Sequence, residues 1–433
     1  MTTHNIFSRR SLLRMAGVSA GLGAGAVALS GCGDDDSGDS GGNQTVEWWH
    51  ISNTDPGLTL YANLAKEFEA ANPGVKINVT PLQNDAFKAK LTTVNQAGDP
   101  PDIFHTWGGG VLAQQAQAGL VKDVTSDTSS LDLIPNAITP YTIDGKAYAF
   151  ASDTGMIGIW YNKDLFAQAG ITTPPATWSA FLAAVQALKS KGITPLALAG
   201  KDKWPGHYYW AYLAMRVGGP EALTKAAADK TFDNPDFVTA GQRLKELVDL
   251  QPFQKGFLGA SYDTPDGEAA TMGNGKAAME VMGQWAPKVQ ESSSASKKGL
   301  GDKLGFFPFP AVEGGKGAAT DAFGGGGGFA VGRNAPPAAI NFIKFLLSAE
   351  PQKKIITTNG TLPVVKSVQS EVTDPNLKLV SQTLTSATGF QLYLDQAYPP
   401  ALGQQVNDSV AQLLAGARTP EQVTEDLTNV AQR

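Results

Sequence analysis

The chain has 433 residues, of which 42% are hydrophobic and 17% are charged, enough for about two or three domains with hydrophobic cores. Its 34 lysines and arginines against 40 aspartates and glutamates give a formal net charge of −6, which argues against a general nucleic-acid binder, because such a protein needs a basic face. The single cysteine excludes an intrachain disulfide and a cysteine-based zinc cluster, and the four scattered histidines offer no metal-ligand pair on one helix, so we expect no metal and no cofactor.

Residues 1–31 are typical of a signal peptide. Arg9 and Arg10 stand just before a run rich in Ala and Gly, which favours the twin-arginine export route, although an ordinary secretory signal can also carry two arginines. This run is the only long apolar stretch of the chain, so a polytopic membrane protein is excluded.

The run ends in the sequence LSGC at residues 29–32, which resembles a bacterial lipobox. We therefore expect a lipid on the thiol of Cys32 and an anchor at the outer face of the cytoplasmic membrane; the alternative is an incidental buried thiol. Residues 32–44 follow, and because Gly, Asp and Ser dominate them, we predict a flexible tether.

From residue 45 the apolar spacing alternates between period 2 and period 3.6. Strands are predicted at 45–52, 75–79 and 102–105, and helices at 58–71 and 84–97. This order predicts a mostly parallel sheet covered by helices. Asp144-Gly145 is a hairpin signal.

Further elements alternate through the rest of the chain. Extended segments are predicted at 154–161, 194–199, 276–281 and 304–308, and helices at 163–170, 178–191, 205–217, 235–250, 336–348, 351–358, 402–415 and 420–432. The fold class is therefore α/β.

With these elements in place, the chain resembles the extracellular solute-binding proteins of ABC importers that bind sugars and oligosaccharides. The resemblance covers residues 45–433 and is carried by the order of several short sequences: GDPPDI at 98–103, WYNKDLF at 160–166, TW at 177–178, GKAAM at 275–279, GQW at 283–285, the glycine-rich segment 324–332 and GARTPEQV at 416–423. NDAFKAK at 84–90 together with WGGG at 107–110 is most similar to actinobacterial binders of xylobiose and short xylo-oligosaccharides. Relatives on the same scaffold take up chitobiose, maltose or trehalose.

The resemblance implies a two-lobed periplasmic-binding-protein-like fold, each lobe a mostly parallel sheet flanked by helices and the two joined by a hinge. It places lobe one at 45–152 and 311–360 and lobe two at 153–310 and 361–433. It also implies a monomer that captures a di- or oligosaccharide by cleft closure and delivers it to the membrane subunits of a permease.

Three tryptophans stand where strands turn into helices: Trp107, Trp204 and Trp285. A pyranose packs its C–H faces on flat aromatic rings, so we predict that these three contact the ligand rather than the core. We expect Trp160 and Trp178 in the core, and one of Trp48 and Trp49 pointing in and the other out, because strand side chains alternate. For Trp210 both interpretations stay open.

Sugar hydroxyls need planar polar groups, and candidates stand near these loops. Asn84 and Asp85 begin a helix, so each is an N-cap or a ligand group. Asp153 faces the cleft or bonds the hinge backbone. The remaining candidates are Gly108, His207, Gly283, Gln284, Gly325 and Gly326. The run at 324–328 lacks the Lys and Ser/Thr of a phosphate loop, so its glycines either admit a ligand to backbone N–H groups or relieve a strained turn.

The rival function is an exported glycoside hydrolase on similar sugars, which needs two carboxylates about 5–9.5 Å apart. No Glu ends a confidently predicted strand near the three tryptophan loops, and Glu280 lies within a strand. A surface adhesion protein would not need tryptophans at loop mouths. We therefore expect a binding protein and not an enzyme.

Overall fold

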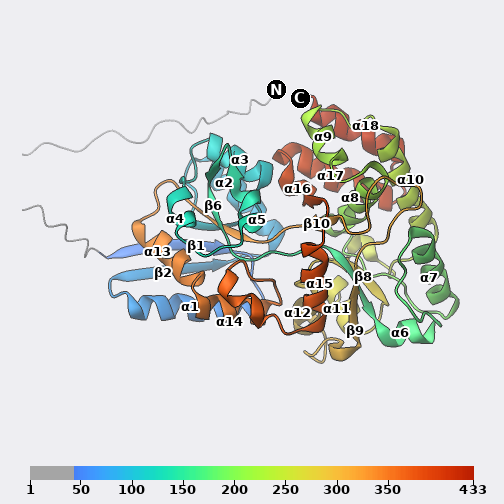
Figure 1. The fold of residues 1–433 in the computed structure, drawn as a ribbon, viewed down its shortest axis with the longest axis horizontal. Helices are drawn as coiled ribbons and strands as arrows, with labels where there is room; N and C mark the ends of the chain where they lie inside the picture. The colour runs from blue at the N-terminus through green and yellow to red at the C-terminus, as the bar shows by residue number, and fades with distance from the viewer. Residues whose placement is uncertain (1–42) are drawn as a thin grey trace, which may run out of the picture. The chain divides into compact units, whose positions relative to one another are not determined.

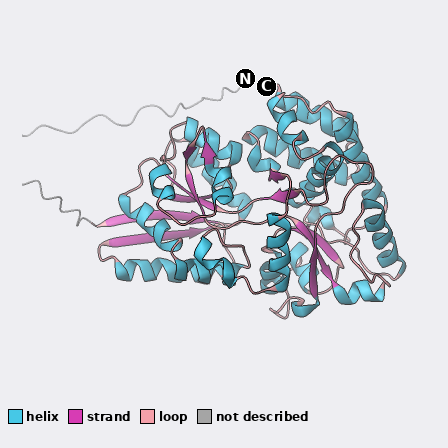
Figure 2. Cartoon of the chain, in the orientation of Figure 1, coloured by secondary structure: helices cyan, strands magenta, loops and turns pink. Residues whose placement is uncertain are grey.

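The computed structural model describes residues 43–433. The predicted signal peptide and Cys32 lie outside these residues, as does the predicted tether except for its last two positions. Gln44 of that tether already belongs to the first strand. Helices cover the sheets along the whole described chain (Figure 2).

The first sheet has five strands in the order β2-β1-β3-β11-β6. Figure 1 labels its strands β1, β2 and β6. β1 pairs with β2 and β3 in parallel, and β11 runs antiparallel to β3 and β6. The predicted β-α-β-α-β order is confirmed, because α1 and α2 supply the crossovers that parallel neighbours require. The bounds are β1 Gln44–His50, α1 Gly57–Ala71, β2 Val75–Pro81, α2 Asn84–Gln96, β3 Ile103–Thr106, β6 Ala149–Ala151 and β11 Gly328–Val331.

The strand β1 shows why these residues fold this way. Val46, Trp48 and His50 are buried while Glu47 is exposed and Trp49 is half-buried. The prediction that Trp48 and Trp49 point to opposite sides is confirmed, as the pleat requires.

The second sheet differs from the expected parallel arrangement. Its order is β8-β7-β9, with β7 Gly158–Asn162 antiparallel to both β8 Met279–Met282 and β9 Leu304–Phe307. The predicted strand at 194–199 contributes only two isolated parallel bridges, from Leu196 to Met279 and from Leu196 to Phe253. The two-lobed α/β architecture itself is confirmed; strand direction in this sheet depends on long-range pairing that apolar spacing does not encode.

The predicted hairpin at Asp144-Gly145 is confirmed. β4 Thr142–Ile143 and β5 Lys146–Ala147 pair antiparallel, and Asp144 and Gly145 have φ of 51° and 78°. Two positive φ values in a two-residue loop are the geometry that matches strand twist.

The remaining elements complete the chain. They are α3 Gly109–Gln117, α4 Thr125–Ser129, α5 Pro135–Ile138, η1 Thr139–Tyr141, α6 Lys163–Gln168, α7 Trp178–Ser190, α8 Trp204–Gly218, α9 Ala222–Ala228, α10 Pro235–Asp249, η2 Phe257–Gly259, α11 Glu268–Gly273, α12 Ala286–Ser293, η3 Gly301–Lys303, β10 Ala322–Gly324, α13 Pro337–Leu346, α14 Ala349–Asn359, η4 Lys366–Glu371, α15 Pro375–Thr385, β12 Phe390–Leu392, α16 Leu394–Ala397, α17 Pro400–Leu414 and α18 Pro420–Ala431. Within residues 43–433, every helix is too short or too polar to cross a bilayer.

Two hydrophobic cores lie under the two sheets. Trp48, Phe104 and Phe342 belong to the first core. The second core contains Trp160, Trp178 and Trp210, so the predicted core positions of Trp160 and Trp178 are confirmed and the open question for Trp210 is answered.

The cores divide the chain later than the predicted lobe boundaries at residues 311 and 361. Val312 and Phe323 pack in the second core, and Val364 and Val368 pack in the first. The lobe boundaries stay a prediction, and these contacts favour placing them near residues 323 and 368. Local sequence does not reveal where the chain passes from one core to the other, because the segments before and after each of these points are equally apolar.

Candidate functional site

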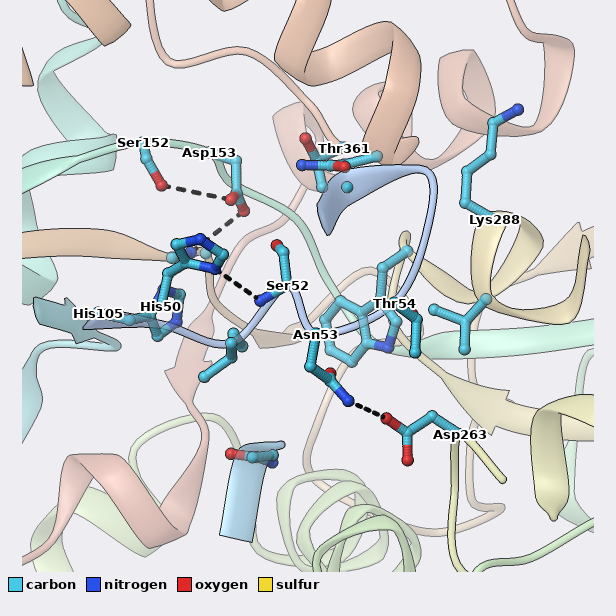
Figure 3. Close-up of a pocket in the computed structure, with 18 of the residues that line it drawn as sticks. His50, Ser52, Asn53, Thr54, His105, Ser152, Asp153, Asp263, Lys288 and Thr361 are labelled. Atoms are coloured by element: carbon cyan, nitrogen blue, oxygen red, sulfur yellow. Dashed lines mark hydrogen bonds between the residues drawn. The ribbon is translucent and has the colours of Figure 1, made fainter. Parts of the chain in front are cut away.

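A cleft lies between groups of residues that belong to the two cores. The first core contributes loops after β1 and β3 and the start of α2, and the second contributes the start of α8 and the turn before α12. Figure 3 shows His50 and His105 from the first group, and Asp263 and Lys288 from the second. The segments that pass between the cores add Ser152, Asp153, Gly326 and Thr361. Ligand groups of α/β proteins gather where strands end, so this is the expected place for a site.

Seven of the predicted ligand residues line this cleft together. They are Asn84, Trp107, Asp153, Trp204, Gln284, Trp285 and Gly326. Their contact with a ligand stays a prediction, but the structure brings them to one place from six separate parts of the chain.

Five predicted residues do not line the cleft: Asp85, Gly108, His207, Gly283 and Gly325. His207 is fully buried, with its ring 4.8 Å from that of Tyr208 and 5.8 Å from that of Phe323. Gly108 has φ of 77°, and a Cβ there would lie 2.2 Å from the carbonyl oxygen of Pro140, so the turn before α3 accepts only glycine at this position. A Cβ on Gly325 would lie 2.8 Å from the ring of Tyr393.

The N-cap interpretation of Asn84 and Asp85 is wrong. Gln83 is the N-cap of α2, and its Oε1 accepts hydrogen bonds from the backbone N–H groups of Asp85 at 2.8 Å and Ala86 at 3.3 Å. Helix N-caps are usually Asn, Asp, Ser or Thr and rarely Gln. The sequence therefore predicted the cap at Asn84 or Asp85, one or two residues after its actual position. Asn84 is thereby left with a buried Oδ1 that has no partner among the described residues.

Unpartnered polar atoms gather in the cleft. Among the residues that the structure describes, seven lining side chains each have a buried polar atom without a hydrogen-bond partner: His50 Nε2, Asn84 Oδ1, His105 Nε2, Trp204 Nε1, Tyr262 Oη, Gln284 Oε1 and Thr361 Oγ1. Each such atom costs about 1–3 kcal/mol unless a partner arrives. A ligand rich in hydroxyl groups would supply those partners.

Two of these side chains are neutral histidines. Burial lowers the pKa of His50 and of His105 to about 3, so both are uncharged at neutral pH. The Nδ1 atom of His50 accepts a hydrogen bond from the backbone N–H of Ser52 at 3.2 Å. Its proton therefore belongs on Nε2, which makes the unpartnered atom a donor.

Asp153 fulfils both roles that its position predicted. It lines the cleft, close to His50 and His105 (Figure 3), and its Oδ1 accepts a hydrogen bond from the backbone N–H of Gly327 at 3.1 Å. Burial raises the pKa of Asp153 to about 7, against the hydrogen bonds from Gly327 and Ser152, which lower it.

Asp153→Asn is expected to change how stability depends on pH. The folded state binds the Asp153 proton more tightly than the unfolded state, whose pKa is near 3.8, so this stabilisation is complete below about pH 4 and is lost as pH rises through about 7. The melting temperature of the wild type minus that of the variant should therefore fall between pH 4 and 7 and level off above pH 8. If the difference between the two melting temperatures stays constant from pH 4 to 8, the raised pKa of Asp153 is contradicted.

Aromatic rings frame the cleft at three positions. The ring of Trp107 is half-buried and 4.5 Å from that of His105, with the Nζ of Lys88 5.0 Å from its centroid. Trp204 packs edge-on against Tyr262 at 5.3 Å. Trp285 is half-buried, with its ring 6.4 Å from that of Tyr393. These indoles offer flat apolar surface beside the unpartnered polar atoms.

Two polar contacts link the two cores across the cleft. The Nζ of Lys88 in α2 forms an ion pair with Asp395 in α16 at 2.9 Å, and the Nδ2 of Asn53 donates to the Oδ2 of Asp263 at 3.4 Å (Figure 3). Burial alone would raise the pKa of Asp395, but the charge of Lys88 and the hydrogen bond that it donates hold this pKa below its ordinary value. Sequence reasoning missed these pairs, because their members lie more than 200 residues apart.

Sequence reasoning also missed His50 and His105. Both lie at or next to the carboxyl end of a parallel strand, His50 as the last residue of β1 and His105 near the end of β3, and that position was the available signal.

The chain is similar in sequence to a known protein family and to several of its members. The model of a family described as bacterial extracellular solute-binding protein matches residues 51–353. The multiple sugar-binding protein of Streptococcus mutans is 26% identical over 337 residues, which cover 74% of this chain and 76% of that protein. The diacetylchitobiose binding protein DasA of Streptomyces coelicolor is 25% identical over 376 residues, which cover 84% of each chain.

Two solved structures resemble the whole described fold. One, from work on xylan utilization by the thermophilic bacterium Caldanaerobius polysaccharolyticus, is 31% identical with a TM-score of 0.82, covering 89% of this chain and 99% of that one. The other, a chitin oligosaccharide binding protein, is 28% identical with a TM-score of 0.82, covering 90% of this chain and 99% of that one.

Proposed function

We propose that this chain, which belongs to the family of bacterial extracellular solute-binding proteins, captures a di- or oligosaccharide in its cleft as the binding component of an ABC importer. The observation that carries the proposal is the mixture of seven unpartnered polar atoms and three indole rings in one cleft. A pyranose matches both, because its hydroxyls are donors and acceptors and its C–H faces are apolar.

The preferred sugar is xylobiose or a short xylo-oligosaccharide. The structure from work on xylan utilization, 31% identical, supports this choice. Chitobiose is the next candidate, since a diacetylchitobiose binding protein and a chitin oligosaccharide binding protein are also similar to the chain. Maltose and trehalose remain further alternatives.

Capture proceeds by closure of the two lobes over the sugar. The bridges from Thr154 to Leu362 and from Met156 to Gly324 join the segments that pass between the cores, so bending occurs there. The sugar drives closure only by binding the closed form more tightly than the open form. The closed form is then recognised by the permease subunits, and no reaction is needed.

The protein works as a monomer at the outer face of the cytoplasmic membrane, held by a lipid on Cys32. A Cys32→Ala variant should appear in the culture fluid or the soluble fraction, while the wild type sediments with membranes. Full membrane retention of the variant would contradict the anchor.

The glycoside hydrolase is the rival function. Four carboxylates line the cleft, and each accepts a hydrogen bond from a protein group: Asp55 from Thr59, Asp153 from Gly327, Asp263 from Asn53 and Asp395 from Lys88. Glu268 in α11 and Glu280 in β8 are fully buried and do not line the cleft.

A thermal-shift assay with a panel of disaccharides tests the proposal. Binding stabilises the protein by RT ln(1 + [L]/Kd), about 2.7 kcal/mol at a hundredfold excess over Kd, so xylobiose should raise the melting temperature. The same samples, analysed for xylose by chromatography, should contain no product. Release of xylose would support the hydrolase, and the absence of any shift across the panel would contradict sugar binding.

A further inference from the structure

Gly283 lies directly beneath the indole of Trp285. A Cβ built on Gly283 would lie 2.1, 2.3 and 2.5 Å from the Cζ3, Cη2 and Cε3 atoms of that ring. Real Cβ atoms essentially never approach another atom within 3.0 Å, so any larger residue would displace the ring. The backbone of Gly283 does not have positive φ, so the indole, rather than the backbone conformation, requires glycine here.

Gly155 likewise lies so close to the side chain of Gln284 that there is no room for a Cβ at residue 155. A Cβ on Gly155 would lie 2.0 Å from both Cδ and Oε1 of Gln284 and 2.4 Å from its Nε2. Gly155 also lacks positive φ. The Gln284 side chain is 1% exposed, lines the cleft and keeps its Oε1 unpartnered, so its amide occupies the space that a residue-155 side chain would need.

The turn that carries these two side chains is held from its buried side. The fully buried Trp160 donates its Nε1–H to the carbonyl oxygen of Gly283 at 2.9 Å and to that of Met282 at 3.2 Å. The Nε2 of Gln290 in α12 donates to the Oε1 of Glu280 in β8 at 2.7 Å, and both side chains are fully buried. Because the backbone of the turn is fixed, an added Cβ would move the side chains in the cleft instead.

We propose that Gly155 and Gly283 are positioning residues of the sugar site, which set the amide of Gln284 and the indole of Trp285 at the distance and angle that the ligand requires. The inference rests on the proposed function, since it assigns these glycines to the same cleft. It replaces the expectation that Gly283 contacts the ligand itself.

Double-mutant cycles test the proposal. Gly283→Ala and Trp285→Ala, alone and combined, form one cycle, and Gly155→Ala with Gln284→Ala forms the other. Gly259→Ala is the matched control, because Gly259 has no positive φ and a Cβ there would meet no atom within 4 Å. Each variant is titrated calorimetrically with xylobiose and, in parallel, with diacetylchitobiose.

Gly283→Ala should weaken binding of the sugar that the wild type takes by roughly tenfold, the share that geometry contributes to an aromatic contact. The same substitution should cause no further loss in the Trp285→Ala background, and Gly155→Ala should behave likewise with Gln284→Ala. Gly259→Ala should bind as the wild type does. Equal losses with and without the partner side chain, or affinities equal to that of Gly259→Ala, would overturn the proposal.

Melting temperatures of the same proteins without sugar keep the test informative if a variant folds poorly. Gly283→Ala should lower the melting temperature in the wild type but not in the Trp285→Ala background, where the ring is gone. If Gly283→Ala lowers the melting temperature equally with and without the Trp285 side chain, the close approach of residue 283 to the indole is contradicted. Failure of the wild type to bind either sugar would count against the proposed function and leave this melting result standing.

Discussion

Trp285→Ala should weaken sugar binding by roughly 30-fold or more while the protein stays folded. Truncating a central aromatic contact commonly costs about 2 kcal/mol or more, which corresponds to about that factor in Kd. The indole of Trp285 lines the cleft and is only half-buried without a ligand, so its removal opens no large hole in the core. Titration calorimetry with the sugar that gives the largest thermal shift measures the change.

Trp49→Ala is the control for this substitution. Trp49 is also half-buried, with the Nζ of Lys90 4.1 Å from its ring centroid, but it does not line the cleft. It should bind sugar with wild-type affinity. If Trp285→Ala binds as tightly as Trp49→Ala does, the stacking role of Trp285 is wrong.

Arg216→Met should lower the free energy of unfolding by about 3 kcal/mol or more. The guanidinium of Arg216 is fully buried and donates to the carbonyl oxygens of Phe309, Pro310, Ala319 and Asp321 at 2.9–3.2 Å. Hydrogen bonds from a charged donor contribute about 1.5–3 kcal/mol each, and a methionine supplies none. These carbonyls belong to the segment that leads from the second core toward residue 323, so its order depends on one side chain.

Urea unfolding, followed by circular dichroism, measures the effect. Arg243→Met is the control, because Arg243 is 39% exposed and forms a surface ion pair with Glu246 at 2.7 Å. Such pairs contribute about 0.2–1 kcal/mol. Equal urea midpoints for the two variants would show that the carbonyl cluster does not depend on Arg216.

The elements with strong local patterns were predictable from sequence. Thr177 precedes α7 and its Oγ1 accepts a hydrogen bond from the backbone N–H of Ala180, and Asn234 caps α10 in the same way through Asp236. Strand β1 follows from the alternation around Trp48. The segment at 194–199 was also predicted as a strand, but it forms only one isolated bridge on each side, because its neighbours Phe253 and Met279 belong to distant parts of the chain.

The tryptophan part of the cleft was likewise predictable, and its polar part was not. Trp107, Trp204 and Trp285 follow predicted strands, so their convergence follows from the rule that sites lie at strand ends. His207 lies one turn after Trp204 in α8, yet it is fully buried, with its ring 5.8 Å from that of Phe323 in the second core, and nothing in the local sequence distinguishes the two positions. Lys88 and Asp395 meet only through the fold, since nothing local to either residue predicts the other.

A crystal structure of the protein grown with xylobiose or a longer xylo-oligosaccharide tests the central claim most directly. We expect a sugar ring stacked on Trp285 or Trp204, with hydroxyls within hydrogen-bond reach of the Nε2 of His50 and the Oε1 of Gln284. A cleft that stays empty at saturating sugar, or that holds a peptide or a metal ion instead, would contradict the assignment of this protein to carbohydrate capture.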